Sequence, residues 1–210
     1  MNEIDVISTT DYTVRARVPA PQPWGIDQMP DGKTLVVGTS AQAILTVDEG
    51  TLTVTQHPVP FLSGPTYGLL YPNVVALANG RVLIIGQEQG IESNNILDGG
   101  QYLLKWNSNT DLFSILEPKG QLSFEVDRIA HSADRKWAFF LADQFYFYSS
   151  DADTVTTVPF DSVSFGLAYS GAVPALSPDG SEIALARGDS IQFADRSLNP
   201  LGNVIFGFTS

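Results

Sequence analysis

The stretch Met29-Pro30-Asp31-Gly32-Lys33, followed by the apolar segment of residues 34–39, decides the fold because the chain repeats its pattern three more times. The other copies are Leu77-Ala78-Asn79-Gly80-Arg81, Ser132-Ala133-Asp134-Arg135-Lys136 and Ser177-Pro178-Asp179-Gly180-Ser181. Each copy is a tight polar turn that precedes a short apolar strand. The Asp or Asn of the turn stands at 31, 79, 134 and 179, which gives spacings of 48, 55 and 45 residues. A period of this size with four strand-like segments is typical of a β-propeller blade.

The repeat predicts an all-β chain that forms one β-propeller domain over residues 1–210, built of four-stranded antiparallel blades. Short segments rich in Val, Ile, Thr, Phe and Tyr alternate with gaps rich in Gly, Pro, Asp, Asn and Ser, as strands and turns require. Their spacing predicts a half-blade at residues 1–20 and four blades, at about residues 21–60, 61–120, 121–160 and 161–210.

The beginning of the chain predicts an incomplete blade. Residues 4–18 have the pattern of a β-hairpin and resemble the outer two strands of a blade whose inner strands are missing. The last blade carries its own outer pair at residues 190–194 and 202–208, so the chain amounts to about four blades and a half. Three interpretations stay open: a piece of a longer propeller, a ring completed by another chain or a second copy, and a smaller ring closed by the hairpin.

Composition and charge exclude several classes of function. The chain has 23 acidic and 11 basic residues, a net charge of −12, so it lacks the basic clusters that bind nucleic acid. It has no Cys, which excludes disulfides and thiolate chemistry. No apolar run approaches the roughly 20 residues of a membrane span, and the N-terminus does not resemble a signal peptide. We expect a cytoplasmic protein or an excised part of an exported one, extracellular, on the cell surface or periplasmic.

Two segments carry a resemblance to a known family. Residues 23–38, PWGIDQMPDGKTLVVG, and residues 4–18, IDVISTTDYTVRARV, resemble the two halves of the YVTN/YncE-type β-propeller repeat. The likeness covers most of the chain and is strongest over residues 4–48; Arg135 replaces the turn glycine in one copy and Asn79 the aspartate in another. The resemblance implies a propeller of the kind exported or attached to bacterial and archaeal surfaces, with binding functions and no catalytic motif to carry over.

Three residues are candidates for a central channel: Asp27, Asp127 and His131, which lie at or near the ends of predicted inner strands. A histidine beside carboxylates is able to act as an acid, a base or a metal ligand. His131 and the other histidine, His57, lack a nearby partner motif, and we favour a structural role for them. The motifs of serine hydrolases, zinc proteases, P-loops and dinucleotide sites are absent, so no catalytic residue is predicted.

A second candidate site is the segment of residues 86–100, which is predicted to be a long loop between two strands of one blade. It offers Glu88, Glu92 and Asp98, hard oxygen donors of the kind that Ca²⁺ prefers, without the spacing of an EF-hand. Calcium is therefore the one cofactor that the sequence leaves open. We favour the alternative of a solvated hairpin extension.

Aromatic residues concentrate in the third blade, where strand alternation predicts Phe145 and Phe147 on one face and Tyr146 and Tyr148 on the other. Such a face could bind carbohydrate or protein. We favour the alternative that both faces, like Trp24 and Trp106, belong to the core between sheets.

Three hypotheses for function follow. The first is a non-catalytic propeller module that acts as a scaffold or binds protein or glycan through its loops. The second is a propeller-type metal-assisted hydrolase or lactonase with an acidic channel site. The third is a structural unit that oligomerises to close a ring, with an edge-to-edge interface at residues 4–18 or 202–208.

Overall fold

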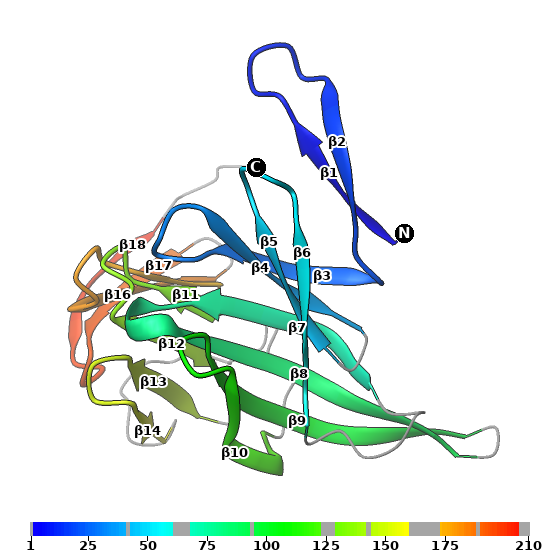
Figure 1. Cartoon of the computed structure of the whole chain (residues 1–210). Helices are drawn as coiled ribbons and strands as arrows, with labels where there is room; N and C mark the ends of the chain where they lie inside the picture. The colour runs from blue at the N-terminus through cyan, green and yellow to red at the C-terminus, as the bar shows by residue number, and fades with distance from the viewer. Residues whose placement is uncertain are drawn as a thin grey trace, which may run out of the picture. The chain divides into compact units, whose positions relative to one another are not determined.

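The computed structural model describes residues 2–40, 43–60, 68–92, 95–122, 129–141, 144–159, 173–187 and 190–205. Its strands form one two-stranded and four four-stranded antiparallel sheets, each with its strands in chain order (Figure 1). The hairpin is β1 (Glu3–Ile7) and β2 (Val14–Pro19); the first sheet is β3 (Pro23–Gln28), β4 (Thr34–Thr39), β5 (Ala43–Asp48) and β6 (Val54–Pro58); the second is β7 (Gly68–Ala76), β8 (Arg81–Glu92), β9 (Asn95–Asn107) and β10 (Leu112–Leu122); the third is β11 (Ile129–His131), β12 (Trp137–Leu141), β13 (Phe145–Ser149) and β14 (Thr154–Val158); the fourth is β15 (Val173–Leu176), β16 (Glu182–Arg187), β17 (Ser190–Asp195) and β18 (Pro200–Ile205).

These sheets confirm the predicted fold class, because four meanders of four strands are the blades of a β-propeller and the hairpin is half of one. The chain divides into two compact units, Met1–Ala76 with Gly80–Gln121 and Leu77–Asn79 with Leu122–Ser210. No helix in the described segments is long and apolar enough to cross a membrane.

The repeated turn owes its shape to one carboxylate and one left-handed residue. Asp31 accepts hydrogen bonds from the backbone N–H groups of Lys33 at 2.8 Å and Thr34 at 2.9 Å, and the aspartates of two other copies do the same. The backbone N–H of Ser181 is the main reason that the pKa of Asp179 falls to about 2. As predicted, the turn glycines have positive φ: Gly32 at 64°, Gly80 at 67° and Gly180 at 70°. Arg135 has the same conformation, at 60°, in the copy without glycine.

In the first unit, the sheet β3–β6 has a different cover on each face. Successive residues of its central strands point to opposite sides, so Val36 and Ile44 pack in one cluster and Val37 and Leu45 in another. The first cluster joins the sheet to β7–β10 through residues that include Trp106. The second joins it to the inner face of the hairpin β1–β2. Because the cores lie between sheets, each sheet depends on its neighbours for burial.

In the second unit, aromatic side chains make the core. Phe145 and Phe147 lie in one cluster with residues of β16, and Tyr146 stacks on Phe140 with ring centroids 4.7 Å apart. Tyr148 is also buried, and its hydroxyl donates to Asp153 at 2.6 Å. Both faces of β13 are thus interior, which confirms the core interpretation and excludes an exposed aromatic face here.

Two expectations were wrong. Residues 86–100 are not a long loop: β8 continues to Glu92, β9 begins at Asn95, and their ladder is interrupted by one irregularity between Gln87 and Gln89. A polar, glycine-containing segment extends a ladder whenever the two flanking strands already pair, because each added residue brings its own backbone hydrogen bonds. Trp24, expected in the core, is 58% exposed.

Candidate protein-binding surface

Asp27 uses its carboxylate on backbone donors. Its Oδ2 accepts from the N–H of Ala76 at 2.8 Å, and its Oδ1 from the N–H of Gln28 at 2.8 Å. The first bond joins β3 to the end of β7, so this side chain connects two neighbouring sheets of the first unit. The role predicted for it in a channel stays a prediction.

His131 ends β11, and its Nδ1 lies 2.9 Å from the carbonyl oxygen of Ser132, which only a ring N–H can satisfy as donor. That bond braces the repeated turn, in line with the structural role that we favoured. Asp127 lies outside the described residues. The proposed meeting of Asp27, Asp127 and His131 is therefore not tested.

The calcium candidates lie on the long β8–β9 hairpin. The backbone places Glu88 opposite Leu69 of β7, Glu92 opposite Asn95, and Asp98 opposite Gln89. Their side chains lie outside the described part of the structure, and the calcium prediction stays open. Among the side chains that are described, no group of three or more His, Asp or Glu is placed to hold a metal ion.

One polar cluster escaped the sequence reasoning. His57 on β6 lies with its Nδ1 2.8 Å from the Asp111 carboxylate and its Nε2 3.0 Å from the Thr46 hydroxyl. The indole N–H of Trp106 donates to the same carboxylate oxygen at 2.9 Å, and its ring lies 4.4 Å from the imidazole. The Trp106 hydrogen bond, followed by that of His57, lowers the pKa of Asp111. The cluster ties β6 to the turn between β9 and β10.

This cluster has the acid–histidine–hydroxyl order of a hydrolase triad, but its surroundings indicate a brace. The acid is also held by Trp106, and the imidazole lies against the indole, so both rings are immobilised in the contact between two sheets. A working triad needs donors for a developing oxyanion next to the nucleophile. The hydrogen bonds described around Thr46 supply none beyond that of His57.

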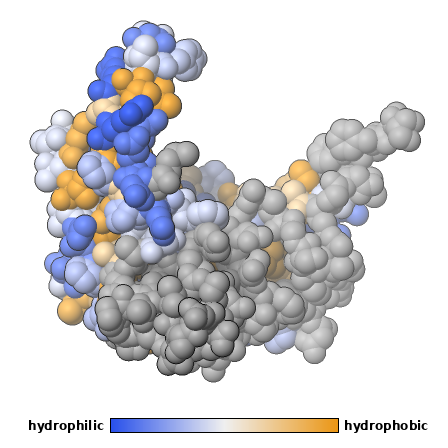
Figure 2. Space-filling model, turned by 90° about the vertical axis from the view of Figure 1, so that its right-hand side faces the viewer, coloured by the Kyte–Doolittle hydropathy of each residue, from blue (hydrophilic) through white to orange (hydrophobic). Residues whose placement is uncertain are grey.

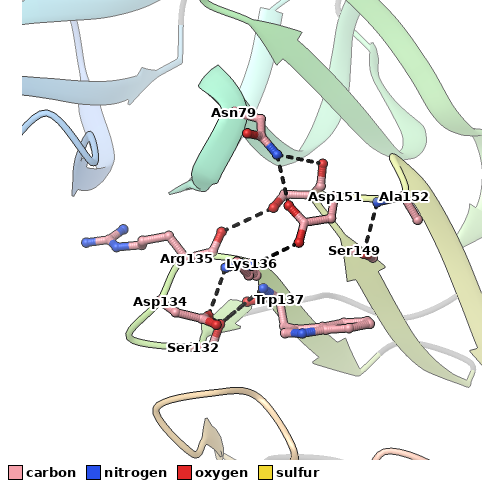
Figure 3. Close-up of polar contacts among 10 residues, drawn as sticks. Asn79, Ser132, Asp134, Arg135, Lys136, Trp137, Ser149, Asp151 and Ala152 are labelled. Atoms are coloured by element: carbon pink, nitrogen blue, oxygen red, sulfur yellow. Dashed lines mark hydrogen bonds and ion pairs between the residues drawn. The ribbon is translucent and has the colours of Figure 1, made fainter.

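A second network, in the second unit, shows how the repeated turn also connects neighbouring segments (Figure 3). Lys136 pairs with Asp151 at 3.2 Å, and this contact is the main cause that lowers the pKa of Asp151. The amide of Asn79 donates to the same carboxylate at 3.1 Å, while the N–H of Ala78 donates to the carbonyl of Arg135 at 2.7 Å. Two copies of the turn are thus hydrogen-bonded to each other. These charges are consumed in structural contacts.

The most distinctive surface lies on β3. Along this strand, Gly25 and Asp27 face the sheet β7–β10, and the alternate residues Trp24 and Ile26 are 58% and 51% exposed. Ile26 is the register partner of Val37, which is completely buried beneath the hairpin. Trp24 and Ile26, called the β3 surface from here on, are therefore the part of an otherwise covered sheet face that the hairpin leaves open.

The hairpin beside it is amphipathic. Its inner positions on β2 go from buried at Val18 to 46% exposed at Val14, and its turn presents Tyr12 to solvent. Its outer face is charged, with Arg17 3.3 Å from Asp5. Figure 2 shows hydrophobic patches interspersed with hydrophilic ones on the hairpin at the upper left. The hairpin and the β3 surface together form one apolar border in the first unit.

Comparisons with known proteins agree with this fold and do not select a function. No family model matches the chain, and no curated protein matches it. Among solved structures, a chain of the complex of KlAtg21 with the coiled-coil of AgAtg16 is similar at 11% identity and a TM-score of 0.60, covering 92% of this chain and 59% of that one. A functionally unknown protein from Desulfotomaculum acetoxidans has 12% identity and a TM-score of 0.56, covering 96% and 63%.

A third similar structure is a structural genomics protein of unknown function from Bacteroides thetaiotaomicron, with 13% identity, a TM-score of 0.51, and coverage of 93% of this chain and 44% of that one. The chain thus spans between 44% and 63% of the length of these similar structures. At such identities the likeness shows the fold alone, and a fold of this kind serves many functions.

Proposed function

We propose that the chain is a non-catalytic binding or scaffold module whose ligand is another protein. The observation that carries the proposal is the β3 surface: an indole and a branched aliphatic side chain, both more than half exposed, lie beside completely buried neighbours. Contiguous exposed apolar side chains next to a core mark interaction sites more often than isolated ones do. Aromatic and aliphatic side chains together suit a protein better than a glycan, which is bound by aromatic rings combined with polar donors.

Other findings support this proposal in general terms. KlAtg21, one of the structurally similar proteins, forms a complex with a coiled-coil of AgAtg16, so a related architecture presents a protein-binding surface. The polar clusters of this chain are occupied in bracing its own sheets. The resemblance to YVTN/YncE-type propellers and a location outside the cytoplasm belong to the same proposal, and both suit a surface-exposed binding module.

The test is site-specific photo-cross-linking in the organism that encodes the chain. A photoreactive phenylalanine at position 26 should form a discrete adduct with a protein partner, and the same residue at Leu112, 65% exposed on β10, should not. The partner is identified by mass spectrometry and purified, and its affinity is measured by calorimetry. We expect Ile26→Asp to weaken binding by about tenfold or more. Equal adducts at the two positions, equal affinity of the variant, or binding to glycans alone would overturn the proposal.

A further inference from the structure

The chain order identifies the hairpin as the second half of a sheet. In each four-stranded sheet the strands pair in sequence, and the fourth strand leads on to the first strand of the next sheet, as β6 leads to β7 and β14 to β15. The strand β2 leads on to β3 after three residues, so β2 corresponds to a fourth strand and β1 to a third. In the described chain, β1 pairs with β2 alone. The other edge of β1 is where a second strand would pair.

The packing between neighbouring sheets says where the first two strands would lie. In the first unit, β7 lies against β3 and β4; in the second unit, β15 lies against β11 and β12. In both cases the first strand of the later sheet rests on the first two strands of the earlier one. By the same rule, β3 would rest on the first two strands of the sheet that β1 and β2 finish. Its exposed side chains on that face are Trp24 and Ile26.

We propose that the β3 surface and the free edge of β1 bind a β-hairpin contributed by another polypeptide, which completes a four-stranded sheet. The second strand of this hairpin pairs with β1 through backbone hydrogen bonds, and its first strand lies over β3. This inference rests on the proposed function, because it names the partner class for the same surface. Strand addition derives affinity from main-chain bonds and specificity from alternate side chains.

The shape of β3 also defines which side chains the bound hairpin needs. On the opposite face, strand β7 approaches so closely that a Cβ at Gly25 would lie 2.7 Å from the Pro72 carbonyl oxygen. There, glycine on β3 meets larger groups on its neighbour. On the exposed face β3 carries Trp24 and Ile26, so the complementary strands should carry small residues, because interdigitating layers alternate large and small side chains.

A second copy of this chain is a poor occupant. Antiparallel pairing of β1 with β1 of another copy has a two-fold axis perpendicular to the joint sheet, which keeps both apolar hairpin faces on one side. Each hairpin already covers its own sheet β3–β6 on that side, so the two sheets would occupy the same space. The net charge of −12 per chain also opposes self-association. A separate polypeptide avoids both costs.

The chain itself supplies a suitable probe. Residues 173–187, VPALSPDGSEIALAR, form β15, the repeated turn and β16, which are the first two strands of a sheet. On one face of this hairpin the register places Ala175, Ala184 and Ala186, while Ile183 and Leu185 belong to the core cluster on the other. A synthetic peptide of this sequence with Ile183→Thr and Leu185→Thr keeps the small face and removes the apolar one. A control peptide carries Ala175→Glu and Ala184→Glu in addition.

The experiment adds each peptide to the full chain and records tryptophan fluorescence and hydrogen exchange. We expect saturable binding of the probe, a blue shift from Trp24, and slower exchange of the β1 amides. Ile26→Asp should weaken binding by about tenfold or more, and Leu112→Asp should leave it unchanged. Because a free peptide folds poorly, the probe is also fused before Asn2 through a flexible linker, which gives a local concentration on the order of 1 mM. The fusion should raise Tm by about 2 °C or more relative to the control fusion.

The outcomes separate the two proposals. If the photo-cross-linked partner binds through Ile26 but neither the peptide nor the fusion protects β1, strand addition is wrong and protein binding stands. If no partner depends on Ile26 and the probe also fails, both are wrong. Sedimentation that shows a dimer of the chain alone, lost in Ile26→Asp, would overturn the choice of a separate polypeptide.

Discussion

The two faces of the sheet β3–β6 differ in what covers them. One face meets the four-stranded sheet β7–β10, and even its first strand is in contact there, through Asp27 and Ala76. The other face meets the two-stranded hairpin, which buries Val37 and Leu45 and leaves Ile26 half exposed. The strands themselves are the same. The difference shows that the number of strands in the neighbouring sheet, and not the composition of β3, decides how far burial extends.

The largest effects should distinguish the two covers through adjacent residues. Ile44 faces the complete sheet and Leu45 the hairpin, and both are buried. Large-to-small core substitutions cost about 2–5 kcal/mol, depending on how well the site collapses. We expect Ile44→Ala to lie in the upper half of that range and Leu45→Ala in the lower half, because a hairpin shifts more easily than a sheet. Urea denaturation measures both, and an equal or greater loss for Leu45→Ala would contradict the comparison.

A smaller effect is expected where the complete sheet approaches β3. The Cβ of Gly25→Ala would lie 2.7 Å from the Pro72 carbonyl oxygen and 2.9 Å from the backbone nitrogen of Val74, so β3 and β7 must separate. Overpacking of this kind costs about 1–3 kcal/mol. Gly50→Ala is the matched control, since its Cβ meets only the Asp48 carboxylate at 3.5 Å. Thermal unfolding that shows the same Tm for the two variants would mean that the close approach is absent.

The brace at the outer edge of the same contact should show itself in acid. Hydrogen bonds from Trp106 and His57 lower the pKa of Asp111 in the folded chain below its ordinary 3.8. The stabilisation is therefore complete above pH 3.8 and is lost as the pH falls below that value.

Asp111→Asn keeps the left-handed turn, which asparagine tolerates, and removes the charge. We expect the stability difference between the original chain and this variant to be constant at pH 5–6 and to shrink toward pH 2, as measured by denaturation at each pH. A difference that is independent of pH would assign the brace to packing alone.

The smallest effect belongs to the open side. Ile26→Ser should change the stability of the isolated chain by less than about 0.5 kcal/mol, because the side chain is already half in water. Val37→Ser, its register partner, removes a buried side chain and should cost about 2 kcal/mol or more. Calorimetry compares the two. A large loss for Ile26→Ser would mean that β3 is covered in the isolated chain, and the proposed binding surface would lose its basis.

The recurring turn shows what local chemistry makes predictable. An aspartate that accepts from the next backbone N–H groups and a glycine that adopts positive φ act within a few residues, so their positions predicted the turns and the strands that follow. Strand alternation likewise predicted that Phe145 and Tyr146 face opposite sides of one buried strand. Arg135 shows the limit of the rule, since it takes the glycine conformation at φ 60° and donates its backbone carbonyl to a neighbouring segment.

The parts that were not predictable depend on residues far apart in the chain. His57 and Asp111 are 54 residues apart and lack any local motif, so only the contact between two sheets brings them together. The segment of residues 86–100 has loop-like composition, yet the pairing already established between β8 and β9 extends through it. Side chains of the calcium candidates Glu88, Glu92 and Asp98 lie outside the described residues, so that prediction waits for an experiment.

By itself, the sequence determined the number and order of the sheets, because hydrophobic alternation and turn chemistry are local properties that each repeat carries within itself. It also indicated that the first two strands form only half of a sheet. The tertiary structure alone decided which side chains that half leaves open. Trp24 and Ile26 have the sequence pattern of core residues, and their exposure follows from the width of the hairpin that covers the opposite end of the same sheet face.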